Sequence, residues 1–318
     1  MSRWLSVLLA LVLAACSEPQ PPIAEDKRAA ADTPEQVAER RADEAYKDEL
    51  RARWLALEQA RRDVSEQIEQ LEQAVAEPDV EPLPTPAASL ATGNPVIAIV
   101  IDDIGHNLHQ ARRLLALPAP VFLAILPNTR GARQLADEAA ALGRTVILHQ
   151  PMENGAGLAI GPGGLYSDMS AVERRQVLTD NLDSFGHIRG INNHMGSRLT
   201  SDRQAMDQVM QVLRERGLYF IDSRTTHHTQ AAFAAEAAGV PHLSRDVFLD
   251  NERDPAAIGR AFDRALKVAR EQGSALVIGH PYPQTIEYLE GRLTGNLLQE
   301  EGVQVVSVEE LMQRKYPR

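Results

Sequence analysis

From about residue 96 onward, the chain alternates between short apolar runs and longer segments with helical periodicity. The apolar runs lie at 96–101, 121–126, 145–148, 188–191, 218–221, 275–279 and 303–306. Several segments between them, such as "SDRQAMDQVMQVLRERG", begin with Ser or Asp at the N-cap and end with Gly. Strands that alternate with helices in this way predict a parallel sheet with helical crossovers. The pattern alone leaves open whether the strands form a (β/α) barrel or a doubly wound open sheet.

The region before this domain has a different pattern. Residues 34–77 are rich in Ala, Glu, Gln and Arg, and their apolar positions recur at steps of four and three, with Arg61 interrupting the series once. This spacing predicts a helix, either a single amphipathic helix packed on its own domain or a coiled coil with itself or a protein partner. The proline-rich residues 78–95 predict an extended linker, so the α/β domain is expected to span 96–318.

The first residues predict export. "MSRWLSVLLALVLAAC" carries one positive charge, and its apolar run is shorter than the ~20 residues of a spanning helix. "LAAC" resembles a bacterial lipobox, which implies that residues 1–16 form a lipoprotein signal region, with cleavage before Cys16 and lipidation of the Cys16 thiol. Cys16 is the only cysteine of the chain, so no disulfide is expected. Residues 17–33 are polar and predict a tether.

By the same resemblance, Ser17 after the cysteine favours the outer membrane. We therefore expect a periplasmic protein that contacts the membrane through its lipid anchor only. The net charge of −11 and the sequence pI of about 5.3 argue against a nucleic-acid partner, because binding to phosphates needs a basic surface.

Polar side chains follow nearly every predicted strand. In chain order they are Asp102 and Asp103, Asn128, His149 and Glu153, Asn192, Asn193 and His194, Asp222, Arg245 and Asp246, and His280. The carboxyl ends of parallel strands meet at one edge of the sheet, where functional residues gather. One Asp and two imidazoles suit a divalent transition metal such as Zn²⁺. A second carboxylate can act as a general base and a further His as a general acid. Singly, each residue also has a purely structural explanation, such as a helix cap.

Seven motifs carry a family resemblance. They read "VIAIVIDDIG", "LAILPNT", "ILHQPMEN", "GINNHMGSRLTSD", "YFIDSRTT", "RDVFLDN" and "IGHPYPQT". In this order, and over roughly residues 95–312, the chain resembles the divergent polysaccharide deacetylase family, a distant branch of the NodB-like carbohydrate esterases. The resemblance implies a distorted (β/α) barrel of about seven parallel strands. It also implies removal of N-acetyl groups from chitin-like or peptidoglycan sugars with a divalent metal, for which Zn²⁺ is the expected ion.

The resemblance also implies roles for the two adjacent carboxylates, with Asp102 as general base and Asp103 as metal ligand. Strand alternation offers a reason for this division, because neighbouring side chains point to opposite faces. NodB-like relatives place two metal-binding histidines four residues apart, whereas this chain has His149 followed by Glu153 in the second position. We therefore predict a metal site of Asp103, His149 and His194, with Glu153 as reserve ligand.

The remaining strand-end residues receive supporting roles. His280 lies where the relatives carry a late-strand histidine, so the resemblance implies that it is the general acid. Arg245 and Asp246 are predicted to orient or neutralise catalytic groups. The predicted substrate groove is lined by Asn128, Asn192, Asn193 and Asp222.

Two functions remain open from the sequence. The first is a metal-dependent hydrolase that removes acetyl groups from N-acetylated envelope polysaccharide or peptidoglycan. The second is a non-catalytic sugar-binding or regulatory envelope lipoprotein that acts through its N-terminal helix. The departure from the paired histidines of the relatives is the reason for keeping the second.

Overall fold

The computed structural model describes residues 48, 52, 93–293, 299 and 301–316 of the chain. The predicted signal peptide and tether lie outside the described residues, as do nearly all of the predicted helical segment and of the linker. Lipidation, the coiled coil and the extended linker therefore stay predictions. Within the described ranges, no helix combines the length and the apolar composition needed to cross a bilayer.

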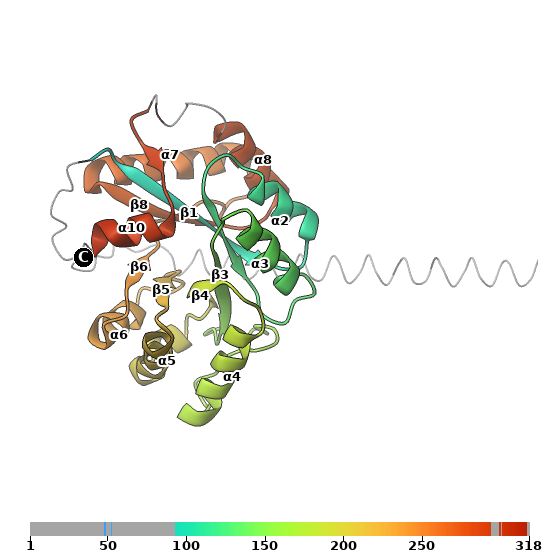
Figure 1. Ribbon diagram of the computed structural model, residues 1–318, viewed down its shortest axis with the longest axis vertical. Coiled ribbons are helices and arrows are strands. Elements are labelled where there is room, and N and C mark those ends of the chain that lie inside the picture. Colours follow the sequence, from blue (N-terminus) through green and yellow to red (C-terminus); the bar gives the residue numbers. More distant parts are fainter. Residues whose placement is uncertain (1–47, 49–51, 53–92, 294–298, 300, 317–318) are drawn as a thin grey trace, which may run out of the picture. The chain divides into compact units, whose positions relative to one another are not determined.

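Parallel strands form the framework of the α/β domain (Figure 1). The strands are β1 (Val96–Ile104), β2 (Val121–Ile125), β3 (Val146–Met152), β4 (Ile188–Met195), β5 (Tyr219–Asp222), β6 (His242–Ser244), β7 (Val247–Phe248), β8 (Ser274–Gly279) and β9 (Gln304–Val305). Among the described strands the order is β6-β5-β4-β3-β2-β1-β8-β7, with β9 paired to β1. This curved parallel sheet confirms the predicted distorted (β/α) barrel, in the form of a half-barrel. Every predicted apolar run overlaps a strand, whereas β6 and β7, with three and two residues, are too short for periodicity to reveal.

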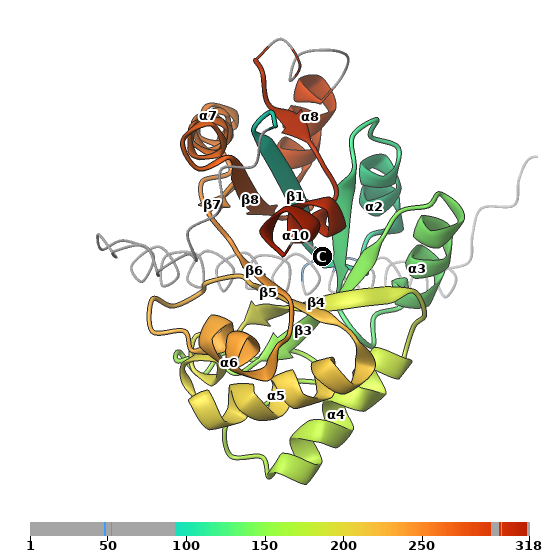
Figure 2. The same ribbon diagram turned by 60° about the vertical axis from the view of Figure 1, so that its left-hand side comes forward.

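Helices connect the strands and cover the outside of the sheet, except for α10, which packs on the inner side (Figure 2). They are α2 (Leu108–Leu115), α3 (Ala132–Ala141), α4 (Ala171–Asp183), the 3₁₀ turn η1 (Leu199–Ser201), α5 (Arg203–Arg216), α6 (Ala231–Ala238), α7 (Pro255–Gln272), α8 (Pro283–Arg292) and α10 (Val308–Lys315). Their ends follow the sequence signals. Ser170 and Glu173 form a capping box at α4, Asp202 caps α5, and Gly217 ends α5 with a φ of 65°.

The apolar core has an outer and an inner layer because side chains alternate along each strand. On β1, Ile97, Ile99 and Ile101 pack in the outer layer against the covering helices. Val96 and Val100 of the same strand belong to the inner layer, which α10 covers with its own apolar residues. Truncating a fully buried side chain such as Ile99 to Ala should cost about 2–5 kcal/mol of unfolding free energy. The inner layer is the one that leads to the candidate site.

The segment between β6 and β7 forms hydrogen bonds with both β5 and β8. Arg245 N donates to the Asp222 carbonyl of β5, and Asp246 N donates to the Leu276 carbonyl of β8, each over 2.9 Å. The Asp246 carboxylate also accepts a hydrogen bond of 2.7 Å from Leu276 N. Asp246 thus has a structural task, because its side chain supplies an acceptor that a longer strand would supply from its backbone.

Candidate metal centre and active site

The inner apolar layer ends in polar side chains at the carboxyl edge of the sheet. Val100 of β1 faces the inner layer, so Asp102, two residues later, continues on the same face. Ile147 and His149 of β3 stand in the same relation. His280 follows β8 with the inward parity of that strand. Alternation along separate strands therefore brings these three side chains to one place.

Asp103 reaches the same place by a different route. Strict alternation would send its side chain to the outer face, opposite to Asp102. The pairing of β1 with β2 instead shifts register between Ile101 and Ile104, and Asp103 has a φ of 55°. A bulge with a left-handed residue turns the side chain inward, at a cost of roughly 1–3 kcal/mol in backbone strain. The alternation argument for dividing the two aspartates is therefore wrong, because both carboxylates lie on one side of the sheet.

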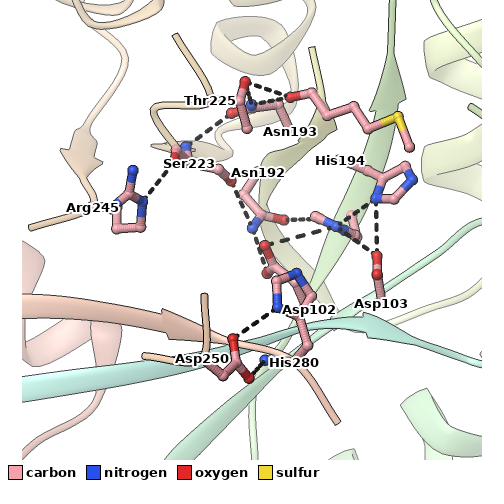
Figure 3. A network of polar contacts seen from close by, with 12 residues as sticks. Asp102, Asp103, Asn192, Asn193, His194, Ser223, Thr225, Arg245, Asp250 and His280 are labelled. Atoms are coloured by element: carbon pink, nitrogen blue, oxygen red, sulfur yellow. Dashed lines mark hydrogen bonds and ion pairs between the residues drawn. The ribbon is translucent and has the colours of Figure 1, made fainter. Parts of the chain in front are cut away.

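Asp103, His149 and His194 bring three ligand atoms together (Figure 3). Asp103 Oδ1 lies 2.9 Å from His194 Nδ1 and 3.2 Å from His149 Nε2, and these two nitrogens are 3.2 Å apart. Ligands held about 2.0–2.1 Å from a tetrahedral metal stand roughly 3.4 Å from one another. The triangle of atoms is thus close to the size of one face of such a site.

The surroundings of Asp103 also fit a cation. Its Oδ1 atom is buried and has no hydrogen-bond partner among the described residues, although the two imidazole nitrogens are near. A buried anionic oxygen without a hydrogen bond is costly unless a positive charge meets it. The side chains of Asp103 and His194 are 34% and 19% exposed, so the cluster is open on one side. One carboxylate and two imidazoles with an open side are a suitable donor set for a catalytic divalent metal.

The pKa values of the two adjacent carboxyl groups are shifted in opposite directions. Burial raises the pKa of Asp102, and the nearby His149 and His280 only partly oppose it. For Asp103, burial alone would also raise the pKa, but His194 and His149 outweigh it and hold the pKa well below its usual range. Neighbouring acids whose pKa values are pushed apart are typical of a general base beside a permanently ionised group.

Asp102 is joined to His149 through an amide. Asn192 Nδ2 donates to Asp102 Oδ1 over 2.7 Å, and Asn192 Oδ1 lies 2.8 Å from His149 Nδ1. The other carboxylate oxygen, Asp102 Oδ2, lies 3.7 Å from His149 Nε2. Asn192 is fully buried. It therefore sits between the predicted base and a predicted ligand.

His280 is held on several sides. Its Nδ1 lies 3.0 Å from Asp250 Oδ1, and its backbone N donates to Asp250 Oδ2 over 2.6 Å. The rings of Phe248 and Tyr282 lie 5.3 Å and 5.4 Å from the imidazole centroid. Burial would lower the pKa of His280, but the Asp250 carboxylate outweighs it and raises the pKa well above its usual value. The Asp250 carboxylate therefore favours the protonated form of His280.

Asp250 received no predicted role from the sequence. Asp250 follows β7, which has only two residues, and its partner His280 comes 30 positions later. The one sequence signal was the position of Asp250 in "RDVFLDN", directly before a turn. A pairing over this separation depends on which strands are neighbours, and only the sheet order shows that.

Three residues with predicted site roles make scaffolding contacts instead of joining the cluster. The buried Asp222 carboxylate accepts hydrogen bonds from Arg224 N and from Thr229 Oγ1, each over 2.8 Å. Asn193 Oδ1 accepts from Ser223 N over 2.9 Å. Arg245 donates to the carbonyls of Ser223 and Arg224 over 2.8 and 3.0 Å. All three hold the loop after β5, and contact with substrate stays a prediction for Asp222 and Asn193.

Glu153 and Asn128 lie apart from the three ligand atoms. The Glu153 carboxylate accepts hydrogen bonds from the backbone N and the hydroxyl of Ser167, and it faces Arg198 at 3.5 Å. Glu153 thus anchors the loop between β3 and α4. Asn128 has a φ of 57° and donates to Asn181 of α4 over 3.4 Å.

Comparisons with known proteins agree with this fold. The Escherichia coli (strain K12) uncharacterized protein YibQ is 39% identical over 208 residues, which cover 64% of this chain and 65% of that protein. The alignment thus spans just under two thirds of that relative. An uncharacterized Haemophilus influenzae protein is 39% identical over 197 residues, covering 62% of this chain and 70% of that protein.

A solved structure shows a similar fold. The uncharacterized protein ATU2773 from Agrobacterium tumefaciens C58 superposes with a TM-score of 0.66 at 23% identity, over 70% of this chain and 90% of that one. At this identity the similarity speaks for the fold alone. The family model of the divergent polysaccharide deacetylases matches residues 99–312, which include every residue of the cluster. The chain belongs to the divergent polysaccharide deacetylase family.

Proposed function

We propose that this protein is a divalent-metal hydrolase that removes acetyl groups from N-acetylated polysaccharide of the cell envelope, including peptidoglycan. The observation that carries the proposal is the metal-sized cluster of Asp103, His149 and His194 with a second carboxylate beside it, Asp102, whose pKa is raised. Membership of the polysaccharide deacetylase family supports the substrate class.

Asp103, His149 and His194 would hold the metal, with Zn²⁺ as the proposed ion. When bound, such an ion polarises a carbonyl and makes a water molecule more acidic. Asp102 is the proposed base. Its Oδ1 atom is engaged by Asn192, so Oδ2, which faces His149, is the oxygen that would take the proton of the attacking water. The raised pKa of Asp102 suits this task because a stronger base accepts the proton more readily.

His280 is the proposed acid. Its Nδ1 is engaged by Asp250, which leaves Nε2 to give a proton to the nitrogen of the sugar as the C–N bond of the acetamide breaks. The raised pKa favours the protonated form of this imidazole, which an acid requires. The rings of Phe248 and Tyr282, which both lie next to the imidazole, restrict its orientation. The products are acetic acid, whose hydroxyl comes from the attacking water, and a free amino sugar whose nitrogen has gained the proton of His280. The proton taken up by Asp102 then restores His280, so that atoms and protons balance over the cycle.

The cellular setting of the proposal comes from the N-terminal residues. The export signal and the lipobox-like "LAAC" support a periplasmic lipoprotein attached through Cys16. The proposed substrate and the proposed compartment therefore agree.

The test is an assay of metal content and acetate release with the full chain. Purified protein should bind Zn²⁺ and release acetate from N-acetylated glucosamine oligomers or from peptidoglycan. A suitable control is Asp137→Asn, which removes an acid whose side chain is 63% exposed on α3. Metal binding without acetate release from any such glycan would contradict the proposed hydrolysis and favour the sugar-binding alternative.

A further inference from the structure

We propose that Asn192 is a positioning residue that fixes the tautomer of His149. In this arrangement the proton is on Nδ1 and the lone pair of Nε2 faces Asp103 and His194. The inference rests on the proposed function only in taking the occupant of this cluster to be a divalent metal. The contacts around Asn192 in the protein itself lead to it.

Asn192 is placed opposite His149 by the sheet. The two residues are direct partners in the parallel pairing of β3 and β4, and both side chains point to the inner face. Both are buried, with 0% and 2% of their surface exposed, so solvent does not offer either polar group an alternative partner. The 2.8 Å contact between Asn192 Oδ1 and His149 Nδ1 must therefore be a hydrogen bond with one donor and one acceptor.

The orientation of the amide decides which atom is the donor. Asp102 Oδ1 lies 2.7 Å from Asn192 Nδ2, and an ionised carboxylate can only accept hydrogen bonds. The amino side of the amide must therefore face Asp102, with Ser223 Oγ as a second acceptor at 3.3 Å. The carbonyl side then faces His149, and a carbonyl can only accept.

His149 must consequently carry its proton on Nδ1. In a neutral imidazole the other nitrogen then has a free lone pair, and Nε2 is the atom that lies 3.2 Å from both Asp103 Oδ1 and His194 Nδ1. Metal-binding histidines commonly have their second nitrogen fixed by such a partner. One amide thus links the proposed base to a proposed ligand.

The first experiment is nitrogen NMR of the metal-free full chain labelled with ¹⁵N-histidine, with His149 assigned by its loss in His149→Gln. The wild type should show the proton of His149 on Nδ1. Asn192→Leu, which keeps the approximate shape but has no amide, should lose this preference. Ser223→Ala removes only the 3.3 Å contact and should retain it. A wild-type His149 without a proton on Nδ1 overturns the inference, even if Asn192→Leu does not fold, whereas an additional proton on Nε2 in the metal-free chain does not, because that nitrogen faces Asp103 and Asp102.

The second experiment is calorimetric titration of the same proteins with Zn²⁺. Loss of a residue that orients a ligand typically weakens metal binding roughly 10- to 100-fold, and we expect this for Asn192→Leu and an unchanged affinity for Ser223→Ala. Equal affinities of wild type and Asn192→Leu would overturn the positioning role. Absence of Zn²⁺ binding in the wild type would instead contradict the proposed function, while the NMR result would still decide the role of Asn192.

Discussion

Asp103 and Asp250 are both carboxylates beside imidazoles at the same edge of the sheet, yet their surroundings differ. Asp250 accepts hydrogen bonds from the backbone of His280 and from Thr285 Oγ1, and it also faces the His280 ring at 3.0 Å. Asp103 Oδ1 has two imidazole nitrogens close by and no hydrogen-bond partner among the described residues. The Asp250 pair is complete by itself, whereas the Asp103 cluster is arranged for a cation.

The two carboxylates therefore differ in where the positive charge beside them comes from in the proposed chemistry. The Asp103 cluster is partly exposed and would take its positive charge from outside the chain. The His280–Asp250 pair carries its positive charge within the fold, on an imidazolium that a buried carboxylate stabilises. Variants that remove one carboxylate at a time should therefore have different consequences for metal binding, for turnover and for pH dependence.

The largest expected effect is on metal binding by Asp103→Ala. Loss of the anionic ligand should abolish Zn²⁺ binding while the fold remains, because the Asp103 side chain lies at the open side of the cluster, although Ala is less favourable than Asp at a φ of 55°. Elemental analysis and circular dichroism measure the two properties. Asp250→Asn is the matched comparison and should keep its metal. An Asp103→Ala protein with the metal content of wild type would remove Asp103 from the ligand set.

Asp102→Asn should separate binding from turnover. The amide is nearly the shape of the carboxylate and can still accept from Asn192, so Zn²⁺ binding should persist. It cannot act as a base, and acetate release should fall by roughly 10²- to 10⁴-fold. A steady-state assay with metal content measured on the same sample provides the answer. An Asp102→Asn variant with wild-type turnover would exclude Asp102 as the base.

Asp250→Asn should change the pH dependence. Because Asp250 raises the pKa of His280, its loss should lower that pKa, and the decline of acetate release on the alkaline side should move to lower pH. The raised pKa also stabilises the fold. This contribution is complete below the unfolded value of about 6.5 and disappears as the pH rises through the folded value.

The measurements for this variant are a pH–rate profile, and denaturant unfolding at several pH values. The pH-dependent part of the stability difference between wild type and Asp250→Asn should be largest at low pH. Asp246→Asn is a useful control, since Asp246 contacts Leu276 N rather than His280. An alkaline limb that stays in place in Asp250→Asn would argue against His280 as the titrating acid.

The smallest effect is expected from deleting residues 34–77. If the protein is a hydrolase, acetate release and Zn²⁺ binding of the remaining chain should be nearly unchanged, because the cluster lies entirely within residues 99–312. The same assays, run on the deleted and the full chain, test this. If the deleted protein still hydrolysed its substrate but lost its cellular function, the N-terminal segment would be the part required for that function.

Much of the candidate site could be predicted from the polar residues that follow each predicted strand. Asp102, His149 and His280 each follow an apolar run with the parity of its inner residues, so periodicity and chain order suffice to place them together. His194 was harder, because its choice over Glu153 depended on the sheet. The structure brings His194 to Asp103 and leaves Glu153 bound to Ser167.

Other features could not be read in this way. The substrate-groove prediction for Asp222 treated it as a strand-end residue like the others, but its parity turns it away from the cluster, toward Thr229. The pairing of Asp250 with His280 needs the knowledge that β7 lies beside β8. The pairing of Asp250 with His280 depends on neighbours that are distant in sequence, whereas Asp222 and Thr229 are seven positions apart.

The sequence alone was enough to predict the longer strands, the capped helices and the gathering of carboxylates and imidazoles at one edge. These features follow from local periodicity and from the direction of parallel strands. The direction in which the side chains of the adjacent aspartates point depends on the tertiary structure. Asp103 faces inward because β1 shifts register against β2 and the backbone adopts a φ of 55°. Such a strained residue persists only when the pairing and packing around it impose it, and no local pattern encodes those contacts.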